Sequence, residues 1–170
     1  MFINQGTLLK SRPIKNMFVE KLSAHGTSYG LTEAGYDIRI QETVTFEPGT
    51  HRPEFKLPAV YIKDGDGIRS NQGRFILASA MEVFQMPYDL VGTVRDKSSW
   101  ARQGISVFNT VIEPGWNGVL TLELVFNGDK RIVIPAGSGI AQVLFGELSD
   151  RGDYGNGKYQ NAPGIQQAKF

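Results

Sequence analysis

Residues 105–126, ISVFNTVIEPGWNGVLTLELVF, contain two runs typical of β-strands on either side of a Pro-Gly turn. Side chains of a strand alternate between its two faces, so Leu120, Leu122 and Leu124 are expected to share one face of the second strand. Glu123 then falls on the opposite face. A glutamate there is either a solvent-facing residue or a carboxylate placed for acid–base chemistry, and the surrounding sequence favours the second interpretation.

The rest of the chain repeats this pattern of short apolar runs and turns. Its 20 glycines and 8 prolines separate runs rich in β-branched and aromatic residues. We therefore predict one mainly β domain, a sandwich, jelly roll or distorted β-barrel with a few short helices. Strands are expected at 36–40, 43–46, 75–79, 81–85, 90–95, 105–108, 119–126, 131–134 and 140–147. Helices are expected at 4–11, within 16–22 and at 98–103.

Composition argues against several classes of protein. The 170 residues carry a formal net charge of +1, which gives no overall field to attract nucleic acid or an anionic membrane. Cysteine is absent and His25 and His51 are far apart, so neither a thiolate zinc site nor a Ser-His-Asp triad is expected. No stretch is apolar enough for a signal peptide or a membrane span. We expect a soluble, cytoplasmic protein.

The C-terminal residues differ from the rest of the chain. Residues 149–170 are rich in glycine and polar side chains and offer little to bury, so we divide the chain into a β domain, 1–148, and a flexible tail, 149–170. Such a tail is either a frayed terminus or a lid that becomes ordered over a ligand. In the second case Arg151, Lys158 and Tyr159 are candidate contacts to an anionic ligand.

The hexamer KSSWAR, residues 97–102, has the composition of a phosphate-binding segment. It offers the cations Lys97 and Arg102, the hydroxyls of Ser98 and Ser99, and backbone N–H groups at the start of a short helix. Unpaired N–H groups and the helix dipole both favour an anion there. The alternative is an ordinary helix start, in which one serine caps the helix and both cations face solvent.

Four further residues are candidate ligand contacts. Glu113 lies in the Pro-Gly turn, and Trp116 after it offers a ring for stacking, although a tryptophan is more often part of a core. Gln142 begins a predicted strand, where its amide could meet a phosphate, and Tyr154 lies in the tail near Lys158. Taken singly, none of these residues identifies a function.

Six segments occur in a particular order along the chain. They are AGYDIRI (34–40), KSSWAR (97–102), NTVIEPGWNG (109–118), TLEL (121–124), GIAQVLF (139–145) and GKYQ (157–160). Together they resemble the dCTP deaminase branch of the dUTPase/dCTP deaminase superfamily, over about residues 30–160. The resemblance implies a dUTPase-like (β-clip) fold, a homotrimer with sites between subunits, and Mg²⁺ bound through the nucleotide triphosphate, without zinc.

The family patterns assign roles to individual residues. The pattern R-S-S-x-A-R falls on KSSWAR and implies that Lys97, Ser98, Ser99 and Arg102 bind substrate, with Ser98 and Arg102 also catalytic. The catalytic glutamate of the family falls on Glu123.

The family turn I-D-P-G-W falls on IEPGW and implies that Ile112, Glu113 and Trp116 bind substrate. Gln142, Tyr154, Lys158 and Tyr159 complete the expected substrate-binding set.

The chain departs from the family at three places. Lys97 replaces an arginine and so offers a point charge in place of a bidentate fork. Glu113 replaces the aspartate expected to meet the 3′-hydroxyl of the sugar. The stretch 107–112 is two residues shorter than in typical deaminases, where it forms the wall around the base.

The resemblance implies a hydrolytic deamination of dCTP to dUTP and ammonia without zinc. A zinc deaminase needs His and Cys ligands, which this chain lacks, whereas a buried glutamate can take a proton from water and deliver it to the base. Arg102 is expected to orient that carboxylate. AGYD, GIAQVLF and RGDYGNG also resemble dUTPase motifs, so a dUTPase, a bifunctional enzyme giving dUMP and pyrophosphate, or an enzyme for a modified pyrimidine is the alternative. A catalytically inactive nucleotide-binding protein is a third.

Overall fold

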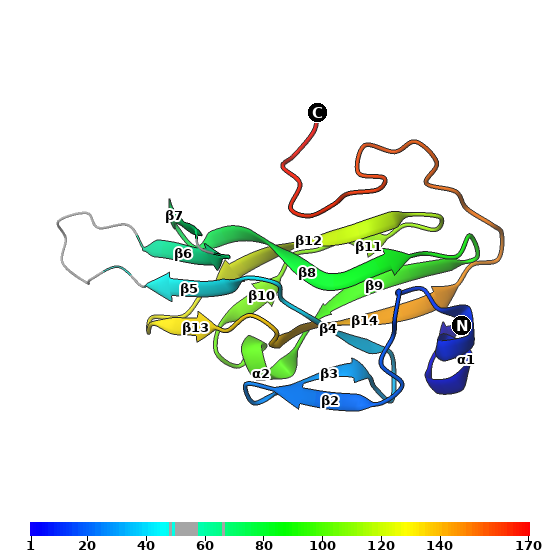
Figure 1. Cartoon of the computed structure of the whole chain (residues 1–170), viewed down its shortest axis with the longest axis horizontal. Coiled ribbons are helices and arrows are strands. Elements are labelled where there is room, and N and C mark those ends of the chain that lie inside the picture. The colour runs from blue at the N-terminus through cyan, green and yellow to red at the C-terminus, as the bar shows by residue number, and fades with distance from the viewer. Residues whose placement is uncertain (48, 50–57, 66) are drawn as a thin grey trace.

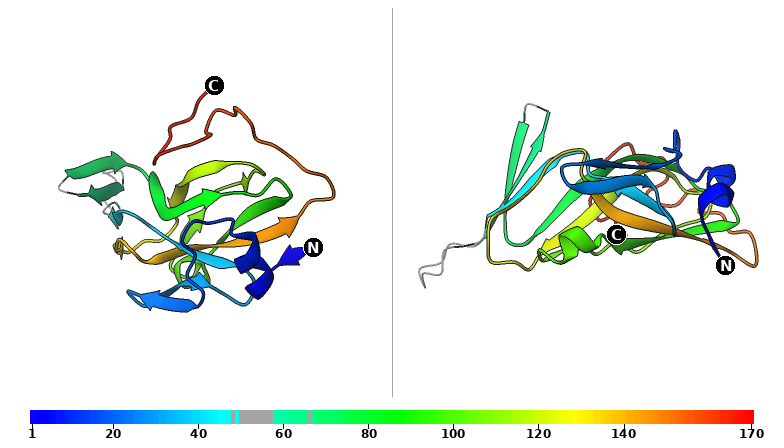
Figure 2. Two further views of the ribbon diagram at one scale, coloured as in Figure 1. Left: turned by 45° about the vertical axis from the view of Figure 1, so that its right-hand side comes forward. Right: turned by 90° about the horizontal axis from the view of Figure 1, so that it is seen from below.

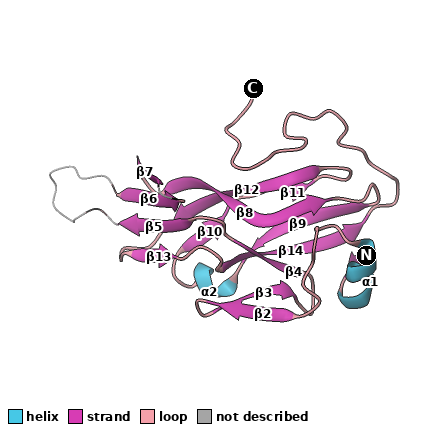
Figure 3. Ribbon diagram, viewed as in Figure 1, coloured by secondary structure: helices cyan, strands magenta, loops and turns pink. Residues whose placement is uncertain are grey.

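The computed structural model describes residues 1–47, 49, 58–65 and 67–170. In these residues the chain is mainly β, with two short helices and three sheets that pack around one core (Figure 1 and Figure 3). The predicted mainly β fold class is confirmed, and the described strands form separate sheets that do not close into a barrel, an arrangement compatible with a jelly roll. Neither helix is long and apolar enough to cross a membrane.

The largest sheet contains the first four strands of the chain together with the last strand, β14, and two strands from the middle of the chain. Its order is β11-β9-β14-β4-β3-β2, and β1 pairs with β14 in addition. Every pairing in it is antiparallel. The strands are β1 (Phe2–Ile3), β2 (Lys21–Ala24), β3 (Thr27–Leu31), β4 (Tyr36–Arg39), β9 (Leu90–Asp96), β11 (Val111–Ile112) and β14 (Gly139–Glu147).

Two smaller antiparallel sheets complete the fold. The order β10-β12-β8 joins β10 (Ile105–Val107), β12 (Asn117–Phe126) and β8 (Phe75–Gln85). The order β13-β5-β6-β7 joins β13 (Ile132–Ile134), β5 (Thr43–Glu47), β6 (Ala59–Asp64) and β7 (Gly67–Gln72). Helix α1 (Gln5–Ser11) lies near the N-terminus and α2 (Ser98–Ala101) follows β9. The β6–β7 hairpin stands away from the other strands (Figure 2).

The core forms where these sheets face one another. Leu122 and Leu124 of β12 are fully buried, as are Phe84 of β8 and Phe145 of β14. Strand alternation explains this, because every second side chain of β12 points into the protein while its neighbours point outward. The side chain of Glu123, between the two buried leucines, therefore points away from the core.

Several sequence predictions need correction. No helix occurs within 16–22, whose end belongs to β2, because Lys21–Ala24 pairs with β3. The predicted strands 75–79 and 81–85 are one continuous strand, β8. The sequence analysis did not predict six of the strands, because their own composition gives a weak strand signal and pairing with neighbouring strands stabilises them. These strands are β1, β2, β3, β6, β7 and β11.

A buried ion pair joins the large sheet to β8. Arg39 Nε donates to Glu82 Oε1 at 2.9 Å, and the Arg39 backbone N–H donates to Glu82 Oε2 at 2.8 Å. The rings of Phe18 and Tyr29 lie 5.0 and 4.8 Å from the guanidinium carbon. Burial raises the pKa of the Glu82 carboxyl, and the hydrogen bonds from Arg39 oppose that rise. The pair thus satisfies a carboxylate whose side chain is only 3% exposed.

Substitution Glu82→Ala should lower the free energy of unfolding by about 3–5 kcal/mol, because it leaves a stacked, partly buried guanidinium without its counter-charge. Chemical denaturation measures this. The matched control is Glu33→Ala, which removes the exposed pair with Lys21 and should leave the free energy of unfolding nearly unchanged. Equal losses of unfolding free energy in the two variants would contradict a stabilising role for the buried pair of Arg39 and Glu82.

Candidate active site

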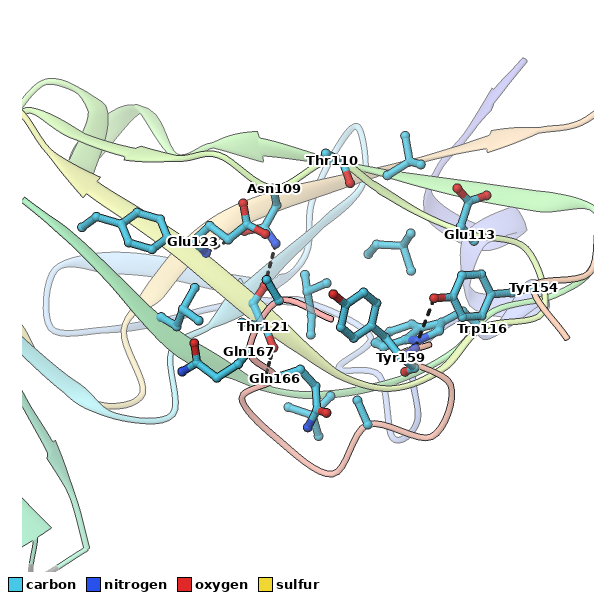
Figure 4. Close-up of a pocket in the computed structure, with 18 residues that line it drawn as sticks. Asn109, Thr110, Glu113, Trp116, Thr121, Glu123, Tyr154, Tyr159, Gln166 and Gln167 are labelled. Carbon is cyan, nitrogen blue, oxygen red and sulfur yellow. Dashed lines mark hydrogen bonds between the residues drawn. The ribbon is translucent and has the colours of Figure 1, made fainter. Parts of the chain in front are cut away.

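A cavity of about 410 Å³ lies between β12, the segment before and after β11, and the C-terminal tail (Figure 4). Most of its wall is apolar or aromatic, and its charged lining residues are Glu113 and Glu123. Its volume is in the range of pockets that bind small organic ligands. The residues that line it are Phe75, Leu77, Asn109, Thr110, Val111, Ile112, Glu113, Trp116, Val119, Leu120, Thr121, Glu123, Tyr154, Tyr159, Ala162, Gln166, Gln167 and Ala168.

Glu123 lies at one end of the cavity, beside Asn109 (Figure 4). It is half-buried, and its backbone pairs with Leu77 of β8. Burial raises the pKa of the Glu123 carboxyl above its ordinary value. The described residues give this carboxylate neither an ion-pair partner nor a hydrogen bond, so it is able to accept a proton from a ligand or a water molecule in the cavity.

The pairing of β12 with β8 is irregular beside the cavity. The register shifts between Val119 and Thr121, so that three residues of β8, 80–82, lie opposite Leu120 alone. Leu120, expected on the core side with Leu122 and Leu124, lines the cavity together with Thr121. Irregularities of this kind are frequent beside functional sites.

The Pro-Gly turn forms the other end of the cavity. Glu113, Trp116 and Tyr154 lie there (Figure 4), and Ile112 lines the wall next to them. Trp116 is buried, with its ring centroid 6.1 Å from that of Phe84, and its Nε1 donates to the Tyr159 carbonyl at 2.7 Å. The tryptophan is therefore both a core residue and part of the cavity wall.

The tail lies over the cavity of its own chain. The Val119 N–H donates to the Ala162 carbonyl at 2.8 Å, and the Gln166 N–H donates to Thr121 Oγ1 at 2.9 Å. The side chain of Gln160 accepts from the Asn117 N–H at 2.7 Å. These contacts explain how a segment with few apolar residues is held, since backbone groups of β12 and the turn supply its partners.

Lys158 lies on the exposed side of this tail. Its Nζ donates to the Lys169 carbonyl at 2.9 Å, and Lys169 Nζ donates to the Lys158 carbonyl at 2.8 Å. Tyr159 is turned inward and lines the cavity. Arg151 lies over the ring of Tyr88, outside the cavity. Of the tail residues predicted as ligand contacts, Tyr154 and Tyr159 line the cavity, whereas Arg151 and Lys158 do not.

The predicted phosphate-binding hexamer is on the far side of the molecule. Helix α2 and the tail lie on opposite sides of the sheets (Figure 1). Ser98, Ser99 and Arg102 are exposed, and Arg102 lines a shallow depression with Lys130 and Arg131. Lys97 is the N-cap of α2, and no side chain caps the helix, so neither serine is used as a cap. Within one chain Arg102 does not meet Glu123.

Lys97 and Gln142 belong to a buried polar cluster around Asp37. Lys97 Nζ pairs with Asp37 Oδ2 and donates to Ser28 Oγ at 2.8 Å. Gln142 Nε2 donates to Thr32 Oγ1 at 3.1 Å and to Asp37 Oδ1 at 3.3 Å. The structure thus gives both residues internal partners, and their contact with a phosphate stays a prediction.

The sequence predictions missed several residues of the cavity. Asn109, Thr110, Thr121 and Gln166 line it, and Gln160 anchors the tail to the turn. The alternation of β12 placed Thr121 on the face of Glu123, which was a usable signal. Polar residues of the hairpin and the tail carry no such periodicity.

No group of three or more potential metal ligands gathers in the described ranges. His25 is exposed in the turn between β2 and β3, and His51 lies outside the described residues.

Comparisons with known proteins place the chain among nucleotide enzymes. The family model described as "dCTP deaminase-like" matches residues 8–148. A dCTP deaminase of Campylobacter fetus is 34% identical over 171 residues, covering 92% of this chain and 92% of the relative. A dCTP deaminase of Acidobacterium capsulatum is 30% identical over 183 residues, covering both chains fully (100% each).

Two solved structures share the fold. EIAV dUTPase matches with a TM-score of 0.50 and 19% identity, over 93% of this chain and 99% of that one. The dCTP deaminase from Agrobacterium tumefaciens matches with a TM-score of 0.51 and 18% identity, over 85% of this chain and 47% of that one. The predicted dUTPase-like fold is thereby confirmed. On the family match and these relatives together, the chain belongs to the dCTP deaminase-like family.

Proposed function

We propose that this protein deaminates dCTP to dUTP and ammonia in pyrimidine deoxynucleotide metabolism. The observation that carries the proposal is the unpaired, half-buried Glu123 at the end of a cavity with a largely apolar and aromatic wall. The chain aligns with the dCTP deaminases of Campylobacter fetus and Acidobacterium capsulatum over nearly their whole length. A cytoplasmic location stays a prediction from the sequence.

In the proposed reaction Glu123 acts as a proton shuttle. It takes a proton from a water molecule whose oxygen adds to C4 of cytosine, giving a tetrahedral intermediate. Glu123 passes this proton to N3 of the ring, where it stays. The hydroxyl proton of the intermediate then passes through the same carboxylate to the amino group, the C4–N bond breaks, ammonia leaves and the C4 carbonyl of uracil forms. A carboxylate whose pKa is raised suits both steps, because it holds the proton more tightly than an ordinary glutamate does.

The far end of the cavity suits the sugar. Glu113 offers acceptor oxygens for a 3′-hydroxyl, and the rings of Trp116 and Tyr159 offer flat surfaces to the nucleoside. Ile112 and Tyr154 complete this end of the wall. Ser98 and Ser99, with Lys97 and Gln142, stay proposed contacts to phosphates, as does Lys158 of the tail.

The charge of the cavity supports a homotrimer with sites shared between subunits. Its described lining contains two glutamates and no lysine or arginine, which is unfavourable for a triphosphate. The exposed Ser98 and Arg102 lie on the opposite side of the chain, where they are able to enter a neighbouring subunit's cavity. Arg102 would then orient the partner's carboxylate and stabilise the phosphates. A closed symmetric assembly satisfies all sites at once.

Mg²⁺ is proposed as the companion of the triphosphate. When bound, it would neutralise phosphate charge, with phosphate oxygens and water as ligands.

A second candidate function rests on Glu113. It lines the same cavity as Glu123 but at the other end, so two carboxylates face one ligand. In dUTPases the corresponding position holds an aspartate that activates the water attacking phosphate. A bifunctional enzyme would release both ammonia and pyrophosphate, giving dUMP from dCTP. A panel of pyrimidine triphosphates, modified bases included, with separate readouts for the two products distinguishes these activities.

Glu123→Gln should abolish ammonia release from dCTP while nucleotide binding persists, because the amide keeps the shape of the side chain but cannot shuttle a proton. Ammonia release and calorimetric binding in the presence of Mg²⁺ measure the two effects. Glu113→Gln is the matched control and should raise the KM for dCTP more than it lowers kcat. An unchanged rate for Glu123→Gln would remove this residue from the mechanism.

The pH dependence follows from the raised pKa of Glu123. The base acts when ionised, so kcat should fall as the pH drops through a value above the roughly 4.3 of an ordinary glutamate. The measurement is kcat against pH between about 4 and 8, with circular dichroism to verify that the protein stays folded. A kcat that stays constant as the pH falls to the ordinary glutamate pKa of roughly 4.3 would contradict the role of Glu123 as a buried base.

Shared sites predict complementation between inactive variants. Arg102→Ala and Glu123→Gln should each be inactive alone. Co-assembly of the two variants in equal amounts should restore activity at about a quarter of the sites, namely those in which one subunit supplies an intact Glu123 and its neighbour an intact Arg102. Ammonia release from co-expressed and from separately purified variants gives the comparison. Full activity of Arg102→Ala, or no recovery after co-assembly, would exclude the shared site.

A further inference from the structure

We infer that Asn109 is a positioning residue for Glu123, a role that depends on the proposed function of Glu123 as proton shuttle. Asn109 is half-buried in the segment between β10 and β11 and lies next to Glu123 in the cavity (Figure 4). Its Nδ2 donates to the Thr121 carbonyl at 2.6 Å, and its Oδ1 accepts from the Glu123 N–H at 3.1 Å. One carboxamide thus bridges two backbone groups of β12.

This bridge continues a sheet where the neighbouring strand ends. Strand β10 pairs with β12 as far as Val107 opposite Leu124, and the Phe108 N–H still donates to the Glu123 carbonyl at 2.9 Å. Beyond that point the main chain leaves β12, since β11 pairs with β9 in the large sheet, with Ile112 opposite Gly92. The edge of β12 would therefore be open at the Thr121 carbonyl and the Glu123 N–H.

The side chain of Asn109 supplies what a peptide group would have supplied there. The carboxamide of Asn carries N–H donors and a carbonyl acceptor in one plane, as a backbone peptide group carries one of each, and one donor and the acceptor are used on β12. Because it is a side chain, the main chain is free to turn away and leave space for the cavity.

The location of the bridge explains its effect on the reaction. The register of β12 with β8 shifts between Val119 and Thr121, directly before the bridged residues. A strand that is irregular on one side and open on the other would let the Glu123 backbone move. Displacements of about 1 Å at a catalytic group cost up to about 100-fold in rate. Asn109 closes the open side and fixes where the Glu123 carboxylate projects.

The chemistry of the position selects an amide. Asp at 109 would retain an acceptor for the Glu123 N–H but would set an anionic oxygen against the Thr121 carbonyl and place a second negative charge beside Glu123. Ala would leave both backbone groups without partners. The two substitutions therefore separate loss of one hydrogen bond from loss of both.

The experiment compares Asn109→Ala and Asn109→Asp with the wild type in ammonia release from dCTP and in amide hydrogen exchange by NMR. We expect Asn109→Ala to lower kcat about 10- to 100-fold with KM changed less than about threefold. The Glu123 amide should exchange at least about tenfold faster in Asn109→Ala and stay protected in Asn109→Asp, while Leu122, which pairs with Ala78, is unaffected in both.

Asn4→Ala is the control. The side chain of Asn4 also bonds a backbone group, with Nδ2 donating to the Glu33 carbonyl at 2.8 Å. Asn4 is the N-cap residue of α1 and is not among the residues that line the cavity, so kcat and the exchange of the Glu123 amide should be unchanged.

Three results would overturn the inference. They are an unchanged kcat in Asn109→Ala, a loss confined to KM, which would make Asn109 a substrate contact, and a Glu123 amide that exchanges equally fast with and without the carboxamide. Absence of ammonia release in the wild type instead overturns the proposed function, and in that case the exchange rates alone still decide whether Asn109 holds the strand.

Discussion

The alternation of side chains along β12 is the constraint on which the site depends. Leu122 and Leu124 are fully buried on one side of this strand, and moving them out would expose the core that joins the sheets. A shift of register by one residue would exchange the two faces, so the packing of the leucines forces Glu123 to the cavity side. The apolar core therefore places the carboxylate, and the energy of placing it is part of the energy of folding.

The sequence predicted the parts of this arrangement that depend on local pattern. The β class, the strand around Glu123 and the turn at Glu113 follow from periodicity and from Pro-Gly signals. Short strands such as β2 and β7 have no such pattern, and pairing with neighbours distant in the sequence creates them. The helix expected within 16–22 is wrong for the same reason.

The candidate site was predictable only in part. Glu113, Trp116, Glu123 and Tyr159 were identified and meet in one cavity. The contribution of Asn109 depends on where the chain leaves β12, and that of Gln160 on where the tail returns to it. Both are facts of tertiary structure. The separation of Arg102 from Glu123 within one chain also had no signature in the sequence, because the order of two motifs along a chain does not fix how far apart they lie in the fold.

Helix α2 is held at both ends by interior contacts. Lys97 is paired with Asp37 at its start, and Trp100 donates from Nε1 to the Gly139 carbonyl at 2.7 Å. Ser98, Ser99 and Arg102 are exposed around these anchors. A segment fixed in this way loses little backbone freedom when an anion arrives, so the conformational entropy of ordering a loop was already spent during folding. Under the proposed function, the affinity gained from these groups would then be limited by side-chain ordering and desolvation, and the association rate would not wait for a loop to close.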